Sequence, residues 1–168
     1  MRVLHDELRW VRHEVAGPEA VRDAFDSKAI HLGCFVERTL AGAIRLVIRQ
    51  PATELPSGKF IPTSRSFTSR CGELCKGVVD VRFRRRGVLT CLFEAALSRA
   101  ATEDVQHLFL SALREYPLYP RYGFSQLGKP FAFNDEHIAP LAPAILFHVE
   151  APFWNPPLTS VRTHMANS

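Results

Sequence analysis

Three features are missing from the sequence, and each absence excludes a class of protein. No apolar run approaches the ~20 residues that are needed to span a bilayer. Residues 1–10 alternate charged and apolar side chains, a pattern that does not fit a signal peptide. Internal repeats and low-complexity stretches are also absent. We therefore expect one globular domain in the cytoplasm, since 168 residues suit a single hydrophobic core.

Cysteine is scarce as well, and its spacing predicts neither a metal site nor disulfide bonds. The chain has four cysteines and no CxxC pair: Cys34, Cys71, Cys75 and Cys91. Cys71 and Cys75 are four residues apart, but no histidine lies nearby at zinc-finger spacing. We expect four reduced thiols, most of them buried, and no bound metal.

The charge balance is mildly basic, with a formal net charge of +4. This favours an anionic ligand or partner, such as a phosphorylated cofactor or an acidic carrier protein. A nucleic-acid binder is not favoured, because the basic residues form no long arm and are not interleaved with aromatic residues in a repeating pattern. The densest basic run is Arg82–Arg86.

Hydrophobic periodicity predicts alternating helices and strands. The predicted helices span residues 6–16, 19–25 and 90–102, with a turn or short helix at 116–122; the predicted strands span 30–36, 41–48, 73–81, 105–113, 124–133 and 144–149. The segment 51–70 is rich in proline, serine and threonine, and long loops of this kind are often functional. The order of elements predicts an α/β domain built around one sheet over residues 1–152, followed by a partly disordered tail, 153–168.

The run Arg82–Arg86 lies between a predicted strand and a predicted helix. Such a turn presents free backbone N–H groups and the positive end of the helix dipole, which together bind anions such as pyrophosphate. Gly87 allows a phosphate to approach the backbone, and Thr90 either caps the helix or donates to a phosphate. A solvated basic loop before an ordinary helix is the alternative interpretation.

Two motifs in this region resemble the GNAT superfamily of acyltransferases. Arg84–Leu89 is similar to the acyl-CoA motif Gln/Arg-x-x-Gly-x-Gly/Ala, with Leu89 in place of the small residue, and Tyr119–Phe124 looks like the family's Tyr-x-x-x-Gly-Phe segment. The resemblance implies a central mixed, mostly antiparallel, twisted sheet flanked by helices. It also implies that Tyr119 protonates the leaving thiolate, although a packed core tyrosine is the alternative. The residues that it places around the thioester cofactor are Val79, Val81, Arg84, Arg85, Arg86, Gly87, Val88, Leu89 and Thr90.

Glu73 is the candidate general base, because several GNAT enzymes place a base on the strand before the phosphate loop. Its apolar neighbours Leu74, Val78 and Val79 favour a raised carboxyl pKa, as a base near neutral pH requires. The alternative is an ordinary carboxylate at the edge of a strand. We expect backbone N–H groups near residues 77–79 to hold the oxyanion.

A series of charged residues resembles a particular branch, the acyl-homoserine-lactone (autoinducer) synthases and the N-acyl amino acid synthases. Besides Glu73, its members are Arg12, Asp23, Asp26, Arg45 and Lys76. The resemblance implies a charge network around an amino acid substrate, in which Arg45 or Lys76 binds the carboxylate and Asp26 or Glu73 attracts the amine. Structural salt bridges are the alternative, and both interpretations can hold together.

The sequence thus predicts an N-acyltransferase that moves an acyl group from an acyl-carrier-protein or acyl-CoA thioester to the amine of an amino acid or a similar small molecule. The basic run, together with Lys59, Arg65 and Arg70, would steer an acidic carrier protein. Four aromatic residues either line an acyl tunnel or belong to the core: Phe60, Phe67, Phe83 and Phe93. A conventional acetyl-CoA-dependent N-acetyltransferase and a non-catalytic module that binds an acyl ligand are the alternatives.

Overall fold

The structure, a computed structural model, describes residues 23–113, 115–132 and 143–153. Its strands are β1 (Ile30–Val36), β2 (Thr39–Arg49), β3 (Cys71–Val79), β4 (His107–Ala112), β5 (Ser125–Gln126) and β6 (Ile145–Glu150). Its helices are α2 (Val88–Thr102) and α3 (Leu118–Arg121), with four 3₁₀ turns: η2 (Asp26–Lys28), η3 (Ala52–Glu54), η4 (Gly58–Phe60) and η5 (Val81–Phe83). The predicted helix at 6–16, most of the one at 19–25 and nearly all of the tail lie outside the described residues.

Within the described ranges, six strands form one sheet in the order β1-β2-β3-β4-β6-β5. β3 and β4 are parallel and the other neighbours are antiparallel, so the predicted mixed, mostly antiparallel sheet is confirmed. The predicted hairpin is also present, and β1 joins β2 through Glu37 and Arg38. Glu37 adopts a left-handed φ of 57° at this turn. In the part of the chain described here, no helix is long and apolar enough to cross a membrane.

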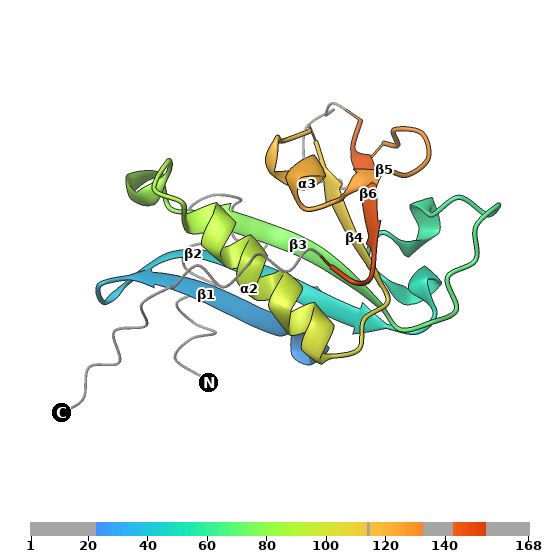
Figure 1. Cartoon of the computed structure of the whole chain (residues 1–168), viewed down its shortest axis with the longest axis horizontal. Helices are drawn as coiled ribbons and strands as arrows, with labels where there is room; N and C mark the ends of the chain where they lie inside the picture. The colour runs from blue at the N-terminus through green and yellow to red at the C-terminus, as the bar shows by residue number, and fades with distance from the viewer. Residues whose placement is uncertain (1–22, 114, 133–142, 154–168) are drawn as a thin grey trace.

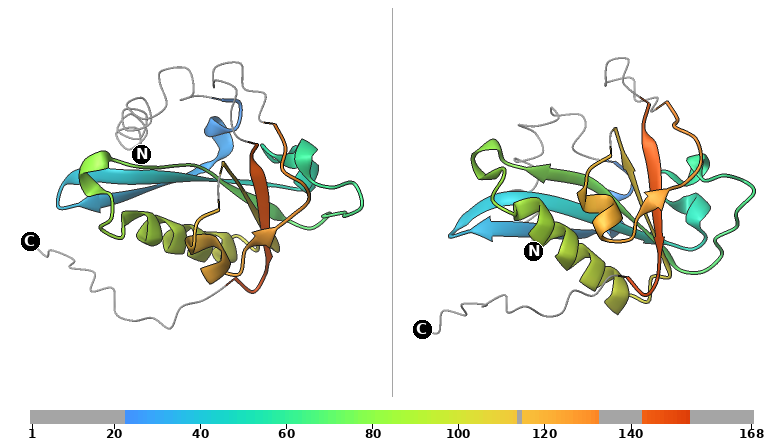
Figure 2. Two further views of the ribbon diagram at one scale, coloured as in Figure 1. Left: turned by 90° about the horizontal axis from the view of Figure 1, so that it is seen from above. Right: turned by 45° about the horizontal axis from the view of Figure 1, so that its top comes forward.

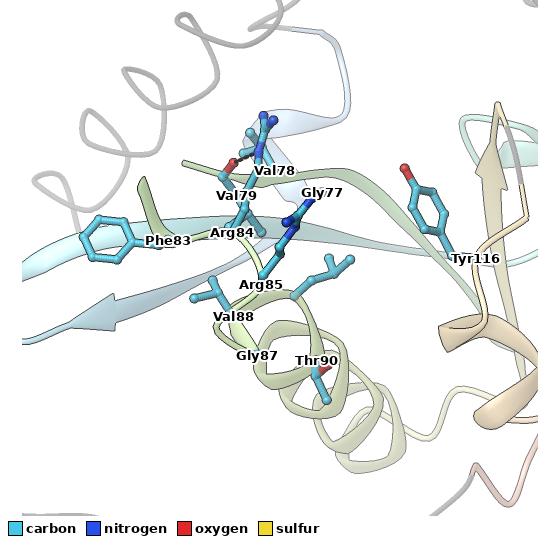
Figure 3. A pocket seen from close by; sticks show the side chains of 11 residues that line it. Gly77, Val78, Val79, Phe83, Arg84, Arg85, Gly87, Val88, Thr90 and Tyr116 are labelled. Carbon is cyan, nitrogen blue, oxygen red and sulfur yellow. Dashed lines mark hydrogen bonds between the residues drawn. The ribbon is translucent and has the colours of Figure 1, made fainter. Parts of the chain in front are cut away.

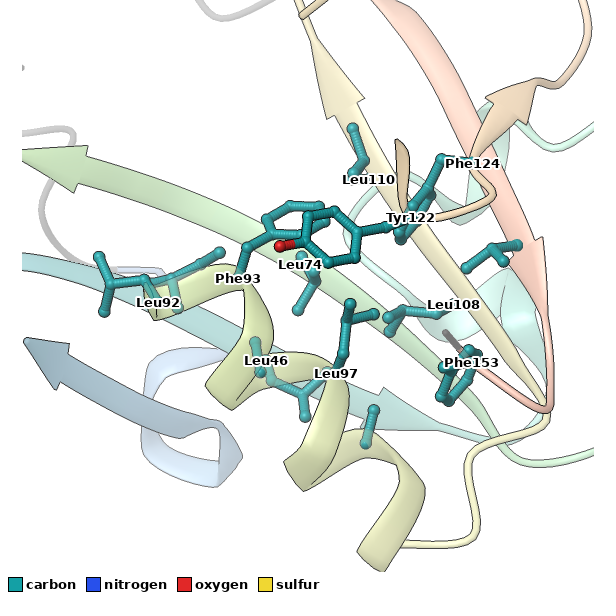
Figure 4. Close-up of a cluster of buried hydrophobic side chains, with 14 of the residues drawn as sticks. Leu46, Leu74, Leu92, Phe93, Leu97, Leu108, Leu110, Tyr122, Phe124 and Phe153 are labelled. Carbon is teal, nitrogen blue, oxygen red and sulfur yellow. The ribbon is translucent and has the colours of Figure 1, made fainter. Parts of the chain in front are cut away.

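Helix α2 covers one face of the sheet, and η2 lies on the opposite side (Figures 1 and 2). The main core lies between α2 and the strands, where Leu92, Phe93 and Leu97 of α2 pack toward Leu46 and Leu74 (Figure 4). A second apolar cluster on the other face combines strand side chains with residues of the 51–70 segment. The sheet therefore carries a packed layer on each face, as burial of both faces of a parallel pair requires.

The parallel pair β3–β4 separates partway along its length. The two strands pair only from Cys71 with His107 to Leu74 with Leu110, although β3 continues to Val79. Beyond the last pair the strands run apart, and Figure 1 shows this divergence. The end of β3 is therefore bonded to β2 on one side only, and a notch opens on its other side.

One predicted strand is much shorter than expected. The segment 124–133 forms only the two residues of β5, followed by an isolated bridge between Phe131 and Ala144. Gly128 adopts a left-handed φ of 75° and Pro130 lacks a backbone N–H, and both features interrupt a strand. The 51–70 segment is a loop, as predicted, but it contains the turns η3 and η4.

Candidate active site

A hollow of about 640 Å³ lies where β3 and β4 diverge (Figure 3). It is bounded by the end of β3, the loop before α2, the first turn of α2 and one residue beyond β4: Gly77, Val78, Val79, Phe83, Arg84, Arg85, Gly87, Val88, Leu89, Thr90 and Tyr116. Of the nine residues predicted to bind the cofactor, Val81 and Arg86 do not line this hollow; Val81 is 70% exposed.

Two left-handed residues shape the loop at the edge of this hollow. Arg85 has a φ of 62°, and Gly87, with a φ of 78°, is the N-cap of α2. The first helical hydrogen bond runs from the Cys91 N–H to the Gly87 carbonyl, at 2.9 Å. The N–H groups of the first turn therefore have no partner within the helix, and together with the helix dipole they favour an anion at this end of α2.

The prediction that Thr90 caps α2 is wrong. The helix begins at Val88, because Gly87 makes the left-handed turn into it without a side-chain cap. Thr90 instead lies within the first turn of α2 and is one of the residues that line the hollow (Figure 3). The second role considered for Thr90, donation to a phosphate, remains a prediction.

The arginines of this loop have different surroundings. Arg82 is held by Asp80, with a distance of 2.6 Å from Nη2 to Oδ2. Arg84 donates from Nε to the carbonyl of Val79 at 3.3 Å, and the Arg86 guanidinium lies 5.9 Å from the centre of the Phe83 ring. Only Arg84 and Arg85 among them line the hollow, so they are the arginines best placed to contact an anion there.

Four of the predicted charged residues meet in one cluster on the face opposite α2. Nη1 of Arg45 lies 2.6 Å from Oδ1 of Asp23 and 2.6 Å from Oδ1 of Asp26. Nζ of Lys76 lies 3.0 Å from Asp23 and 3.6 Å from Asp26. Arg45 also donates from Nε to Sγ of Cys75 at 3.1 Å. The predicted network among these residues is therefore present, while its sixth member, Arg12, lies outside the described residues.

Burial and charge act against each other in this cluster. Burial alone would raise the pKa of Asp23, but the hydrogen bonds from Arg45 and Lys76 outweigh it and lower that pKa to about 2. The pKa of Asp26 is lowered in the same way, mainly by Arg45. Because their pKa values are lowered, both aspartates are ionised. They surround the guanidinium of Arg45, a residue that is only 1% exposed to solvent.

Glu73 lies on β3 beside this cluster, but it bonds to a different partner. Its side chain is 1% exposed. Ser57 donates from its N–H to Oε2 at 2.8 Å and from its hydroxyl to Oε1 at 2.7 Å. Burial raises the pKa of Glu73, and the two bonds from Ser57 offset part of that rise. The raised pKa expected from the sequence is confirmed in direction, although the enclosing residue comes from the distant 51–70 loop.

The tyrosines near α3 occupy three different environments. Tyr119 packs against Phe93 and Phe147, with ring centroids 6.0 Å and 5.1 Å apart. Tyr116 contacts Tyr119 edge-on at 5.7 Å and is the tyrosine that lines the hollow. Tyr122 is fully buried and donates to Glu94 at 2.8 Å; burial, reinforced by this bond, raises its pKa to about 12. Sequence reasoning missed Tyr116, although it lies one helical turn before Tyr119.

The four phenylalanines considered for an acyl tunnel do not share one space. Phe93 belongs to the core beneath α2, whereas Phe67 packs against Phe109 in the cluster on the opposite face. Phe60 stacks on Phe131 at 3.8 Å, and Phe83 lies in the loop before α2. The core interpretation is therefore confirmed for Phe93, and the four side chains are distributed over different parts of the fold.

Comparisons with known proteins agree with this geometry. Residues 2–124 match the model of the acetyltransferase (GNAT) family. A search among curated protein sequences found no match. Solved structures that share the fold include three acyltransferases. An acyl-homoserine lactone synthase, BjaI, solved with SAM and isopentyl-CoA, has a TM-score of 0.63 at 17% identity, over 89% of this chain and 76% of that one.

The other two are similar at a comparable level. The N-acyl amino acid synthase FeeM from uncultured soil microbes has a TM-score of 0.59 at 19% identity, over 90% of this chain and 85% of that one. An aminoglycoside 6'-acetyltransferase of type Ii has a TM-score of 0.59 at 17% identity, over 89% and 90%. Identities of this size show a shared fold, while the family match covers most of the chain. The chain therefore belongs to the acetyltransferase (GNAT) family.

Proposed function

We propose that the protein is an N-acyltransferase that moves an acyl group from a CoA or acyl-carrier-protein thioester to the amine of an amino acid or a similar small molecule. The observation that carries this proposal is the hollow between the diverging strands, with an anion site at its edge. Membership of the GNAT family supports acyl transfer. The likeness in fold to FeeM and BjaI favours an amino-acid-like acceptor.

The donor thioester fits the hollow from the α2 side. Its phosphates would bind the first turn of α2 and the side chains of Arg84 and Arg85. Its phosphopantetheine arm would follow the end of β3, where backbone groups on the notch side have no strand partner. The thioester carbonyl would then lie near the N–H groups of residues 77–79, which stabilise the oxyanion formed when the amine attacks.

The leaving thiolate needs a proton, and a tyrosine of the segment after β4 supplies it in this proposal. Tyr119 holds the position of the acid in the family motif, and Tyr116 is the residue that lines the hollow. Their rings touch, so removing either hydroxyl tests one residue while the ring packing is kept. Comparison of kcat for Tyr116→Phe and Tyr119→Phe identifies the acid, since loss of a general acid lowers kcat by about 10²-fold or more.

The acceptor fits the charge cluster on the other face. Arg45 is buried and already bound by two aspartates, so it positions Asp23 and Asp26 rather than reaching a ligand. Lys76 and Asp23 are the more exposed members, at 19% and 36% of their side chains. In this proposal Lys76 binds the carboxylate of the acceptor and Asp23 attracts its ammonium group.

Thiol release tests the proposal directly. Acyl-CoA and acyl-carrier-protein donors would be incubated with a panel of amino acids and other small amines, and free thiol would be measured. We expect amine-dependent release, and an increase of about tenfold in the donor KM for Arg84→Ala or Arg85→Ala. Arg99→Ala is the matched control, because Arg99 lies in the last turn of the same helix and pairs with Glu103. Binding of donors without turnover would instead indicate a non-catalytic module.

A conventional acetyl-CoA-dependent N-acetyltransferase is the second candidate, and one observation favours it. The aromatic side chains that a long acyl chain would need are divided between the two faces of the sheet. A donor series from acetyl to dodecanoyl separates the candidates. A kcat/KM that falls with each added pair of carbons supports acetylation, whereas a maximum at a longer chain supports the primary proposal.

A further inference from the structure

The carboxylate of Glu73 is sealed from the space where an acceptor amine would bind. Glu73 and Ser57 are each 1% exposed, and both carboxylate oxygens accept hydrogen bonds from Ser57. A base in this position cannot touch a substrate without breaking bonds that compensate for its burial. If Glu73 takes a proton during acyl transfer, that proton has to arrive through another group.

Ser57 connects Glu73 to a second hydroxyl group. Oγ of Ser57 lies 3.2 Å from Oγ of Ser111. A serine hydroxyl has one proton, and Ser57 gives its proton to Oε1 of Glu73. With Glu73 ionised, the Ser57 oxygen therefore accepts the hydroxyl proton of Ser111. The three side chains form one directed chain of hydrogen bonds that ends at Ser111.

Ser111 lies at the start of the notch. The last residue of β4 that pairs with β3 is Leu110, so Ser111 is the first residue of β4 beyond the parallel pairing. Its side chain is half-buried, in contrast to the fully buried Glu73 and Ser57. Side chains alternate along a strand, so Ser111 shares the face of Phe109, which pairs with Glu73. The hydrogen-bonded chain thus runs from the buried carboxylate to the opening between the strands.

We propose that Glu73 accepts the proton of the attacking amine through the hydroxyl groups of Ser111 and Ser57. The inference rests on the proposed acyl transfer and names how its base works. As the amine nitrogen forms its bond to the thioester carbon, its proton passes to Ser111 Oγ. The Ser111 proton passes to Ser57 Oγ, and the Ser57 proton passes to Oε1 of Glu73. Each hydroxyl gains one proton and loses one, so the negative charge of Glu73 is replaced by a negative charge on the former carbonyl oxygen. When the carbonyl double bond forms again from this tetrahedral intermediate, the C–S bond breaks and the thiolate leaves.

The arrangement suits a base that works at a distance. Burial raises the pKa of Glu73, and a raised carboxyl pKa suits a general base that acts near neutral pH. Both bonds from Ser57 hold the carboxylate in one orientation. The competing interpretation is that this network only fixes the 51–70 segment on the sheet, and it predicts no effect of Ser111 on proton transfer.

Variants at Ser111 distinguish these interpretations. Ser111→Ala leaves both bonds between Ser57 and Glu73 in place and removes only the outer hydroxyl. The matched pair Ser111→Thr and Ser111→Val differs by a hydroxyl against a methyl group at nearly equal volume. We expect Ser111→Ala and Ser111→Val to lower kcat by about 10²-fold with the donor KM unchanged, and Ser111→Thr to restore most of the rate. Ser98→Ala, on the exposed side of α2, is the control for an unrelated serine.

The dependence of the rate on solvent and pH gives a second readout. For the wild-type chain, kcat plotted against the fraction of D₂O should be curved, because several protons move together, and kcat should rise with pH as Glu73 ionises. In Ser111→Val the pH-dependent rise should be lost. A Ser111→Val chain that folds and keeps the wild-type kcat and pH profile overturns the relay, while acyl transfer itself stands. Absence of thiol release from the wild-type chain with every donor overturns the proposed function and the relay with it.

Discussion

Arg45 and Lys76 bind the same two aspartates through different carboxylate oxygens, but the exposure of the two cations differs sharply. Arg45 is buried, so Arg45→Met takes from the buried Asp26 its closest cation, at 2.6 Å, and leaves only the more distant Lys76, at 3.6 Å; we expect a loss of about 3–5 kcal/mol in the free energy of unfolding. Lys76 is partly exposed, and Lys76→Met should cost no more than about 1 kcal/mol. The same variant should raise the KM for an amino acid acceptor, because it removes the cation proposed to bind the carboxylate. Urea unfolding and steady-state kinetics check the two effects.

The control for this prediction is another arginine–carboxylate pair of similar length. Arg70 lies 3.1 Å from Glu103, but its side chain is 46% exposed. Arg70→Met should therefore change stability by less than about 1 kcal/mol. Equal losses for Arg45→Met and Arg70→Met would show that burial of the cluster does not determine its strength.

At single positions, sequence reasoning found charged residues better than it found their neutral partners. Asp23, Asp26, Arg45 and Lys76 stood out because their order and spacing resemble those of the autoinducer and N-acyl amino acid synthases, and the structure brings them together. Ser57 carried no comparable signal, since it lies in a loop rich in serine and threonine. Its bond to Glu73 joins residues 16 positions apart, and only the folded loop creates that contact.

The N-terminal turn of α2 is positioned by its contact with β2, and a glycine makes this contact close. A Cβ atom at Gly42 would lie 2.7 Å from the carbonyl oxygen of Val78, 3.0 Å from Cγ1 of Val88 and 3.2 Å from Cδ1 of Leu92. We expect Gly42→Ala to lower the free energy of unfolding by about 1–3 kcal/mol. It should also raise the donor KM, because Val88 lines the hollow and would have to move. Thermal unfolding and donor titration measure both.

Gly77 offers a matched control within the same sheet. A Cβ atom at Gly77 would meet nothing closer than Ile44, at 3.8 Å, so Gly77→Ala should leave stability almost unchanged. If both substitutions destabilise the chain equally, the loss reflects strand glycines in general rather than the approach of α2. A stable Gly42→Ala chain with an unchanged donor KM would contradict the prediction in full.

At the level of elements, local sequence patterns predicted whether a segment forms a helix or a strand, but not the length over which neighbouring strands remain paired. The strands at 30–36 and 73–81 and the helix at 90–102 followed from apolar periodicity, and the structure contains all three within a few residues. The divergence of β3 and β4 had no such signal, because their apolar residues continue past the last pair. The hollow depends on this tertiary feature, so its lining at Tyr116 was not predicted.

Across the whole molecule, the sheet separates the two proposed substrates. The anion site and α2 lie on one face, and the charge cluster with Glu73 lies on the other. In the proposed reaction, the notch between β3 and β4 is where an acyl group bound on the first face would meet an amine bound on the second. The proposed reaction would therefore require both faces of the sheet to stay packed, which links the stability of the sheet to function.

This packing makes stability depend on acid at His148. Burial, together with the nearby His107 and Arg65, lowers the pKa of His148 to about 4, while Glu150 acts in the opposite direction. In the unfolded chain a histidine has a pKa of about 6.5. As pH falls from about 6.5 to about 4, the unfolded chain binds a proton that folded His148 excludes. The free energy of unfolding should therefore fall by about 2–3 kcal/mol over this window and no further below it from this residue.

His148→Phe tests this assignment, because the side chain lies among the rings of Phe67 and Phe109. Urea unfolding from pH 7 to pH 2 should show a stability that declines between pH 6.5 and pH 4 for the wild-type chain and a flatter curve in that window for the variant. Asp23 provides an internal reference in both chains. Its depressed pKa gives stability that is present above about pH 4 and is lost as pH falls toward about 2, so the two curves should decline in parallel there. Equal slopes between pH 6.5 and pH 4 would place the acid sensitivity elsewhere in the molecule.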